Sequence, residues 1–483
     1  MGCLFPPRFS IRLCKAELVT PKEATPREKK PLSDIDDQAS LRYHMPGLWF
    51  YEARPSMRDV DPAALVKDGL AKALVFYYPL AGRLFEGPNK KLVVDCNGEG
   101  ALFVRAEADV ALAKLGRFVQ SPCPYLKKLQ YHVPGSDGIT GAPLLLIQVT
   151  RFTCGGFALG VRFNHTMVDG YGVALFLNAV CELANGASAP SVLPVWEREL
   201  LTVESKETAL ARSHSSATRD LQGLYGLVAR RKRFFKPLDM ERWAGVILNF
   251  DKVAAMPRFF FFPGILRPIL LQRSFLVGPK EIQVLKDQAV AQGYGQCTTF
   301  EVVAACLWKC RTVALQPDPS MTVRVTFPTD IRGRSSATEL PLPRGYYGNA
   351  IVMLSASTTA KQLSESPISY AIELIREAKG KLSSDYVNSV MDFMVCNGRP
   401  RMSVFGNILV SDISRIGLEK LDFGWGDAIF AGASTAAYGA TFLERPKSAA
   451  AGSERSILVP IALPHISMMI FKREWKKMTT PSS

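Results

Sequence analysis

Hydrophobic and polar positions in the N-terminal part of the chain follow two periods, which predict helices mixed with strands. Apolar residues three and four apart over 62–78 (PAALVKDGLAKALVFYY) predict an amphipathic helix, and the apolar stretch 170–183 (GYGVALFLNAVCEL) predicts a buried one. Short apolar or alternating runs predict strands, namely KLVVDC, PLLLIQVTRF and FALGVRFNH.

The C-terminal part of the chain repeats this mixture. Helical spacing predicts helices at 281–291, at 300–313 and within SYAIELIREAKGKL, and strands are predicted at MTVRVTFPTD, SVFGNILVSD and SILVPIALP. Helices and strands that alternate on both sides of a polar and basic stretch predict an α/β protein of two similar-sized lobes. We expect the lobes at 1–199 and 274–483, joined by a long crossover at 200–273.

The expected crossover is the most basic part of the chain. A polar stretch (SKETALARSHSSATRD) leads into a run of four cations at 230–233, and residues 222–273 hold ten Lys or Arg against three Asp or Glu. Such a charge run is typical of a solvated connection, and it is also typical of an arm that binds nucleic acid or an anionic membrane surface. The solvated crossover is the plainer interpretation.

The composition of the 483 residues is that of an ordinary folded protein, with 47% hydrophobic and 21% charged residues. An excess of 59 Lys and Arg over 44 Asp and Glu attracts anions, but charge alone does not choose among nucleic acid, acidic lipid and a phosphorylated cofactor. The ten cysteines form no C-x-x-C pair and no secretory leader accompanies them, so we expect reduced thiols and a cytoplasmic protein. No apolar run reaches the roughly 20 residues of a spanning helix, which argues against integral membrane association.

The stretch FALGVRFNHTMVDGYG carries the best candidate for chemistry. An apolar strand delivers His165 to its end, and Thr166 to Asp169 form the exit before the next helix. An imidazole with an ordinary pKa near 6.5 is largely neutral at pH 7, so His165 is a candidate general base. From spacing alone, a histidine without a special role is an equally open interpretation.

Other motifs fail on inspection or have a plain structural explanation. Gly170-Tyr171-Gly172 follows a strand and opens a helix, but the third glycine of a dinucleotide fingerprint would fall at Leu175. No P-loop is present in the sequence. Thr298 and Glu301 stand in capping-box register before an apolar helix, whose N-terminus could also hold an anion.

Four motifs together point to one family. Residues 165–170 (HTMVDG) match its HxxxDG motif and residues 422–426 its DFGWG motif, while 78–83 (YPLAGR) and 341–349 (PLPRGYYGN) match two further stretches in the same order. The chain therefore resembles the plant BAHD acyl-CoA-dependent acyltransferases over nearly all of residues 15–475. Within that family, TPREKKPLSDIDDQASLRYHMP and ALQPDP are similar to the benzyl alcohol O-benzoyltransferase-like subgroup.

The resemblance implies two chloramphenicol-acetyltransferase-like lobes, each a mixed sheet with helices, and a solvent channel between them. His165 would lie midway along the channel, reached by acyl-CoA from one side and by the acceptor from the other. Its imidazole would remove a proton from the acceptor hydroxyl as the oxygen attacks the thioester carbonyl, with no acyl-enzyme and no metal. Acyl-CoA would be a co-substrate, and no permanently bound cofactor is implied.

The resemblance also implies supporting roles for other residues. Asp169 would turn away from His165 and pair with Arg332 or Arg334, and Gly170 would permit the tight exit of the loop. The DFGWG segment would lie remote from His165 and hold the second lobe and the CoA side in shape, through Asp422, Gly424, Trp425 and Gly426. Residues near CoA would be Thr298, Thr299 and Ser411.

The expected reaction is transfer of a benzoyl, acetyl or similar group from acyl-CoA to the hydroxyl of a small alcohol, carried out by a monomer. The alternatives are acylation of an amine or of a larger specialised metabolite, and a catalytically inactive acyltransferase-like binding protein. The absence of a recognised nucleic-acid-binding fold argues against a nucleic acid partner. Residues 230–271 depart from the family pattern and look like an insertion or a mis-spliced exon.

Overall fold

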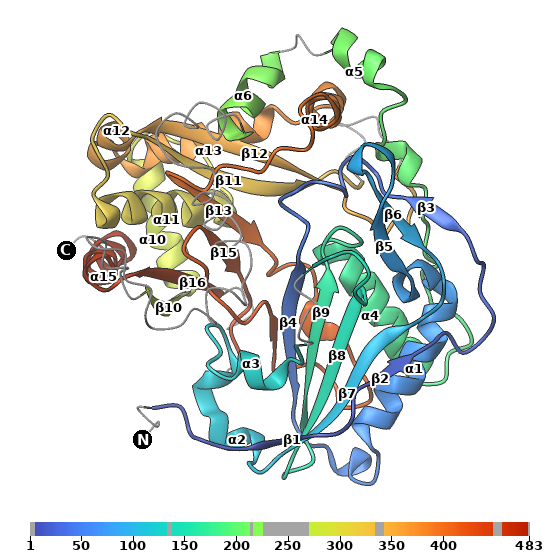
Figure 1. Cartoon of the computed structure of the whole chain (residues 1–483). Coiled ribbons are helices and arrows are strands. Elements are labelled where there is room, and N and C mark those ends of the chain that lie inside the picture. The colour runs from blue at the N-terminus through green and yellow to red at the C-terminus, as the bar shows by residue number, and fades with distance from the viewer. Residues whose placement is uncertain are drawn as a thin grey trace, which may run out of the picture.

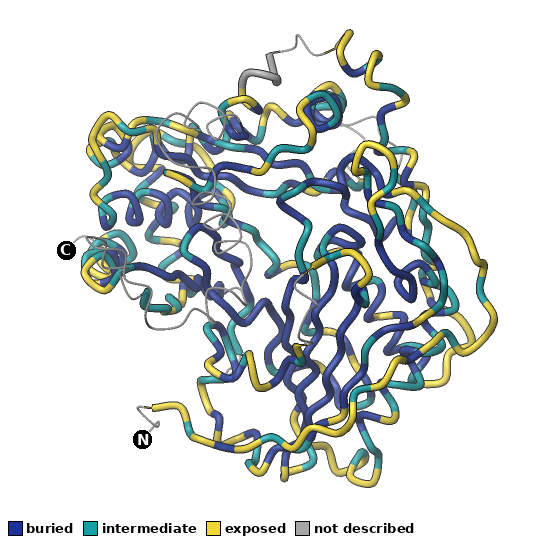
Figure 2. Tube along the Cα trace, viewed as in Figure 1, coloured by how far each residue is buried: buried dark blue, intermediate teal, exposed yellow. Residues whose placement is uncertain are grey.

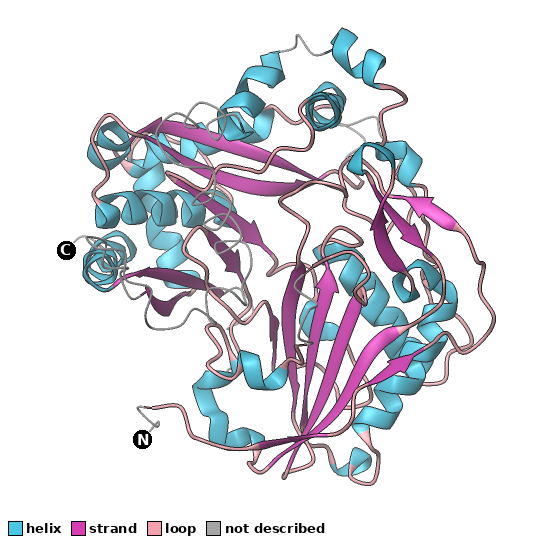
Figure 3. Ribbon diagram, viewed as in Figure 1, coloured by secondary structure: helices cyan, strands magenta, loops and turns pink. Residues whose placement is uncertain are grey.

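Two lobes, each built on a β-sheet with helices, make up the computed structural model (Figure 1, Figure 3). The structure describes residues 5–132, 138–212, 216–225, 270–333, 342–447 and 456–481, without the side chains of 216–219. Buried strands run through the middle of each lobe and exposed segments lie on the outside (Figure 2). The expected α/β class with two sheet-containing lobes is confirmed.

The N-terminal lobe contains a seven-stranded mixed sheet in the order β1-β7-β8-β9-β4-β14, with β2 also paired to β7. Its strands are β1 (Ile11–Leu13), β2 (Glu17–Val19), β4 (His44–Tyr51), β7 (Ala101–Ala108), β8 (Leu145–Phe152), β9 (Phe157–Asn164) and β14 (Phe430–Gly432). A smaller sheet consists of β3 (Lys29–Pro31), β6 (Leu92–Asp95) and β5 (Arg83–Glu86). Every residue of β4 and β9 is buried, which explains why both strands are largely apolar along their whole length.

Two long helices, α1 (Pro62–Phe76) and α4 (Gly170–Ala184), pack against each other behind the large sheet (Figure 1). Gly69 permits this close approach, because a Cβ atom there would stand 2.5 Å from the carbonyl oxygen of Val180. The short helices α2 (Leu112–Leu115) and α3 (Leu126–Leu129) belong to the connection between β7 and β8.

The C-terminal lobe contains a four-stranded sheet in the order β12-β11-β13-β15 and a two-stranded ribbon. The sheet consists of β11 (Thr322–Asp330), β12 (Ile351–Thr359), β13 (Asn407–Asp412) and β15 (Ala440–Leu443), and the ribbon of β10 (Leu270–Val277) and β16 (Ile457–Pro464). Its helices are α10 (Pro279–Ala291), α11 (Thr299–Leu315), α12 (Ala360–Glu365), α13 (Ile368–Gly380), α14 (Ser384–Cys396) and α15 (His465–Thr479). None of the helices in the described residues has the length and hydropathy to cross a bilayer.

The elements with the strongest periodicity are confirmed to within a few residues. The helices expected at 62–78, 170–183 and 300–313 are α1, α4 and α11, and the strands expected in FALGVRFNH and MTVRVTFPTD are β9 and β11. Apolar periodicity is a reliable signal here because each of these elements buries one continuous stripe or run of side chains.

The two lobes exchange segments, so the sequence boundaries at 199 and 274 do not separate them in space. β14 comes from the C-terminal part of the chain and pairs with β4 in the N-terminal sheet. In the other direction, α5 (Lys206–Arg212) and α6 (Ser216–Tyr225) pack against α14 of the C-terminal lobe. These helices lie within the expected solvated crossover, whose described part is therefore packed. Its basic run falls in 226–269, outside the described residues.

Glu444 is a buried carboxyl group that follows β15. Its Oε1 atom accepts hydrogen bonds from the backbone N–H groups of Ala433 at 2.8 Å and Ser434 at 3.3 Å. No ion pair joins Glu444 to a cation within the described residues, and burial raises its pKa to about 7. The folded chain therefore holds a proton on Glu444 more tightly than the unfolded chain does.

This raised pKa predicts a pH dependence of stability. The contribution of Glu444 is fully present below about pH 4.5, the ordinary pKa of the group, and is lost as the pH rises through about 7. We predict that the melting temperature of the wild type falls between about pH 5 and pH 8, and that the fall is smaller in Glu444→Gln. The exposed Glu23→Gln is the matched control and should follow the wild type. Identical pH profiles for Glu444→Gln and the wild type would contradict a raised pKa of Glu444.

Candidate active site

His165 begins the loop that joins β9 to α4. Its backbone N–H donates to the carbonyl oxygen of Tyr43 at 2.9 Å, and its own carbonyl oxygen accepts from Nδ2 of Asn349 at 2.8 Å. The imidazole lies near the rings of Tyr43 and Phe163, with centre-to-centre distances of 5.6 and 5.9 Å. Contacts from both lobes therefore fix the backbone of this histidine.

The surroundings keep the imidazole neutral. Burial lowers the pKa of His165, and it outweighs the opposing influence of the residue's own carbonyl group and of the charge on Asp169. Among the described residues, the buried Nδ1 atom has no partner in hydrogen-bond geometry. A neutral imidazole at pH 7 can accept a proton, which is the property that a general base needs.

Both carboxylate oxygens of Asp169 are occupied by other groups. Oδ1 caps α4 by accepting from the N–H of Gly172 at 2.9 Å, and Oδ2 accepts from the N–H of Ala350 at 3.0 Å. Arg332 donates from Nη1 to Oδ2 at 2.9 Å and from Nη2 to Oδ1 at 3.2 Å. The side chain of Asp169 is 3% exposed, so this ion pair is buried and joins the lobes. Of its two expected partners, Arg332 is the one in contact, and Arg334 lies outside the described residues.

Three residues that the sequence analysis missed complete the support of the loop, namely Asp36, Arg198 and Asn349. Asp36 is fully buried and accepts from the backbone N–H and the Nδ2 of Asn349 at 2.8 and 2.9 Å. Arg198 pairs with Asp36 at 3.2 Å and donates from Nη2 to the carbonyl oxygen of Met167 at 2.9 Å. Burial alone would lower the pKa of Arg198, but the charge on Asp36 outweighs it and the pKa is raised. The one signal in the sequence was the acidic run SDIDD, which precedes an apolar strand.

Aromatic rings surround the Arg198 guanidinium. Its central carbon lies 4.5 Å from the ring centre of Trp196, 5.0 Å from that of Tyr347 and 5.2 Å from that of Tyr346. Gly348 leaves room for the cation, because a Cβ atom there would fall 1.0 Å from Nη1 of Arg198. The GYYGN run therefore serves the packing of a buried cation beside the histidine loop.

The DFGWG segment packs against the N-terminal sheet, whereas the sequence analysis expected it to support the second lobe. Oδ1 of Asp422 accepts from the N–H groups of Gly424 and Gly426, each at 2.7 Å. Both glycines have positive φ angles, of 99° and 80°, which disfavour other residues. Trp425 meets the ring of Phe157 on β9 edge to face at 5.0 Å. The segment therefore braces the strand that carries His165.

The residues expected near CoA have structural contacts of their own. Thr298 caps α11 by accepting from the N–H of Glu301 at 3.2 Å, and Glu301 accepts from the N–H of Thr298 at 2.9 Å. Thr299 is the first residue of α11 and Ser411 lies on β13. Gly170 begins α4, where a Cβ atom would stand 2.8 Å from Cδ1 of Ile416. The hydrogen bonds of Thr298 hold the helix end and do not reach the His165 loop.

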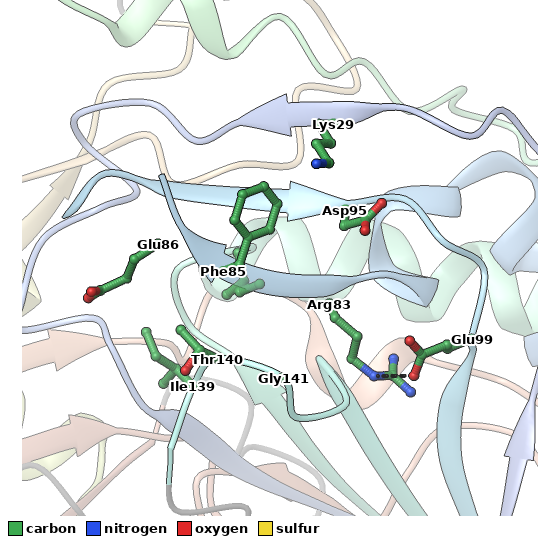
Figure 4. Close-up of a pocket in the computed structure, with 10 residues that line it drawn as sticks. Lys29, Arg83, Phe85, Glu86, Asp95, Glu99, Ile139, Thr140 and Gly141 are labelled. Carbon is green, nitrogen blue, oxygen red and sulfur yellow. Dashed lines mark ion pairs between the residues drawn. The ribbon is translucent and has the colours of Figure 1, made fainter. Parts of the chain in front are cut away.

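A cavity of about 780 Å³ lies in the N-terminal lobe, away from His165, beside β5 and the 139–141 segment (Figure 4). Arg83 and Glu99 form an ion pair at 3.1 Å on one side of it, and Phe85, Glu86, Ile139 and Thr140 line the other. His165 is not among the residues that line it.

Within the described residues, no three His, Cys, Asp or Glu side chains gather so that they could hold a metal ion.

Comparison of the sequence with known families and proteins gives full-length matches. The profile of the Transferase family matches residues 9–225 and 269–478. The chain is 42% identical to alcohol acyl transferase 1 allele GSd of Malus domestica over 478 residues, which cover 99% of this chain and 95% of the relative. It is also 42% identical to alcohol acyltransferase 1 of Actinidia chinensis var. chinensis over 477 residues, with 98% and 95% covered.

Comparison of the fold with solved structures agrees. The crystal structure of vinorine synthase superposes with a TM-score of 0.69 at 21% identity, covering 97% of this chain and 98% of that protein. TRI101 of F. sporotrichioides, solved with coenzyme A and T-2, superposes with a TM-score of 0.62 at 15% identity and covers 93% and 98%. The two-lobed architecture is therefore shared with these proteins.

The contacts of Asp169 generate a prediction about stability. Asp169→Ala removes the buried counter-charge of Arg332 and leaves it only the half-exposed Asp330, so we expect a loss of about 3 kcal/mol in the free energy of unfolding, measured by urea denaturation. Asp330→Ala is the control, because Asp330 also contacts Arg332, at 3.1 Å, but its side chain is 48% exposed. Equal losses in the free energy of unfolding of the two variants would show that burial of the ion pair does not determine its contribution to stability.

Proposed function

The chain belongs to the plant BAHD acyltransferase family, and from that premise we propose that it is an alcohol acyltransferase that moves an acyl group from acyl-CoA to the hydroxyl of a small alcohol. The observation that carries this function is 42% identity to alcohol acyltransferases over nearly the whole chain. The half-buried, neutral His165 that follows β9 supplies the group that the reaction needs. Acyl-CoA is the co-substrate, and a basic protein suits its phosphates.

His165 acts as the general base of this reaction. Its neutral imidazole takes the proton from the acceptor hydroxyl while that oxygen attacks the thioester carbonyl. The tetrahedral intermediate collapses, the C–S bond breaks, and the proton passes from the imidazolium to the departing CoA thiolate. Both substrates are bound together, so catalysis consists of proton transfer and alignment, without an acyl-enzyme.

Asn349 holds the backbone of His165 through its side-chain amide. Its Nδ2 group donates to Asp36 and to the His165 carbonyl oxygen, both of which can only accept, so the orientation of the amide is set by the network. This leaves Oδ1 of Asn349 buried without a partner among the described residues, as is Nδ1 of His165. The Asn349 side chain also helps to raise the pKa of the imidazole, against its burial. A neutral imidazole that carries its proton on Nδ1 leaves the lone pair on Nε2, where the base is needed.

The enzyme works as a monomer in the cytoplasm, with benzoyl or acetyl groups as the first donors to examine and benzyl alcohol as the first acceptor. Nine free cysteines among the described residues suit a reducing compartment. Amines and larger specialised metabolites are the alternative acceptors, since the same base would deprotonate either.

The test of this function is release of free CoA thiol, together with ester formation, from benzoyl-CoA or acetyl-CoA and benzyl alcohol. We predict that His165→Ala lowers turnover by at least about 100-fold while CoA binding stays nearly intact. His465→Ala, at an exposed histidine that begins α15, should keep full activity. Comparable turnover in His165→Ala would remove His165 from the mechanism. If the folded wild type shows no thiol release with any tested acyl-CoA, alcohol or amine, the protein would be an inactive binding protein.

The pH profile of kcat tests whether Asn349 influences the pKa of His165. Burial lowers the pKa of His165 below 6.5, so we predict that the wild-type profile loses activity only below about pH 6.5. Asn349→Asp places a carboxylate beside the imidazole, raises its pKa and moves this acidic limb to higher pH. Asn397→Asp, at the end of α14, is the matched control and should leave the limb in place. An unmoved limb in Asn349→Asp would contradict an influence of residue 349 on the pKa of the imidazole.

A further inference from the structure

A polar cavity of about 170 Å³ in the C-terminal lobe contains a buried arginine. Arg324 lies near the start of β11 and is only 9% exposed. The cavity is bounded by α6, β12 and the end of α13, through Asp220, Gly223, Ser355, Ser357, Glu377 and Lys381. It therefore lies where the crossover helix α6 covers the C-terminal sheet.

The charge of Arg324 is not matched by a direct partner. In the part of the chain that the structure describes, no hydrogen bond or ion pair joins its guanidinium to another residue. Burial lowers the pKa of Arg324, and the charge on Asp220 opposes this only from a distance. Asp220 is already engaged, because its Oδ2 atom accepts from Nζ of Lys381 at 2.6 Å. Arginine keeps its proton at neutral pH, so the half-compensated guanidinium favours an anion that contacts it directly.

Hydrogen-bond donors converge on the same space. In the register of β11 with β12, Arg324 stands opposite Ser357 and Thr326 opposite Ser355. Residues opposite each other, and alternate residues of one strand, share a face of the sheet, so the guanidinium and the two serine hydroxyls lie side by side. The guanidinium fork and the hydroxyl groups form a donor set suited to phosphate-like anions. Lys381 adds an ammonium that is paired with Asp220, and the carboxylates of Asp220 and Glu377 also line the cavity.

The size of the cavity limits what can occupy it. Its volume equals roughly five or six water molecules at about 30 Å³ each. Pockets for drug-sized ligands span about 300–1,000 Å³, so the cavity admits a small ion and not acyl-CoA. Along β11, Arg324 lies about 20 Å from Asp330, which is next to the Asp169–Arg332 pair. The cavity is therefore separate from the candidate active site.

We propose that this cavity is a binding site for a small tetrahedral oxyanion, such as inorganic phosphate, held by Arg324 with Ser355 and Ser357. The bound ion joins α6 to the β11–β12 pair and so ties the crossover to the C-terminal lobe. An ion that binds only the folded chain multiplies the ratio of folded to unfolded molecules by one plus its concentration over its Kd, about elevenfold at ten times the Kd.

Thermal unfolding of the full chain tests the site. Sodium phosphate is added against sodium chloride at constant ionic strength, with the wild type, Arg324→Met and Arg473→Met, whose arginine is exposed. We expect a saturable rise of the melting temperature with phosphate in the wild type and in Arg473→Met. Arg324→Met should equal or exceed the wild type in chloride, because it no longer buries an unmatched charge, and should gain nothing from phosphate.

The opposite results are equally specific. A phosphate-dependent rise that persists in Arg324→Met, or none in the wild type, would overturn the assignment. An equal effect of acetate would contradict a tetrahedral ion, and a larger effect of CoA that depends on Arg324 would assign the cavity to the co-substrate. Should Arg324→Met fail to fold, Gly223→Ala keeps the arginine but places a Cβ 3.2 Å from its Nη2, and phosphate titration calorimetry should then show weaker binding than in the wild type.

Discussion

The buried ion pair between Asp169 and Arg332 is the constraint on which the rest of the structure depends. The side chain of Asp169 is almost fully buried, and among the described residues its charge is stabilised by Arg332 and by the N–H groups of Gly172 and Ala350. Gly172 belongs to α4, whereas Arg332 and Ala350 follow β11. These contacts therefore form only when the two lobes have their correct relative position. Loss of any one of these partners leaves the Asp169 charge poorly solvated. The conformation of the histidine loop therefore depends on all three contacts.

Around this pair the lobes are interleaved. The 418–432 segment leaves the C-terminal lobe and enters the N-terminal core, where the Trp49 Nε1–H and the Tyr51 hydroxyl donate to carbonyl oxygens of Leu418 and Leu421, each at 2.9 Å. Asn349, from the C-terminal lobe, reaches the His165 carbonyl. A histidine braced from both sides keeps one position, and in the proposed reaction such alignment is a large part of catalysis by proximity.

Local patterns in the sequence predicted the features that local forces build. α1, α4, β9 and β11 follow from apolar periodicity, and His165 and Asp169 followed from a short motif. The pairing of Asp36 with Arg198 joins residues 162 positions apart. A local sequence pattern does not indicate which distant residue a charged side chain will contact in the folded chain. The packing of DFGWG on the N-terminal sheet and of α5 and α6 on α14 was missed for the same reason, since the partners of these segments are set by tertiary structure.

The most direct test of the interlobe clamp is a double-mutant cycle on kcat for ester formation, with Asp169→Ala, Arg332→Ala and the double variant. If the two side chains act as one unit, each single variant loses most of the turnover and the double variant loses no more than the worse of the two. Losses that multiply in the double variant would mean that Asp169 and Arg332 act independently, and would contradict a histidine loop held by their pairing.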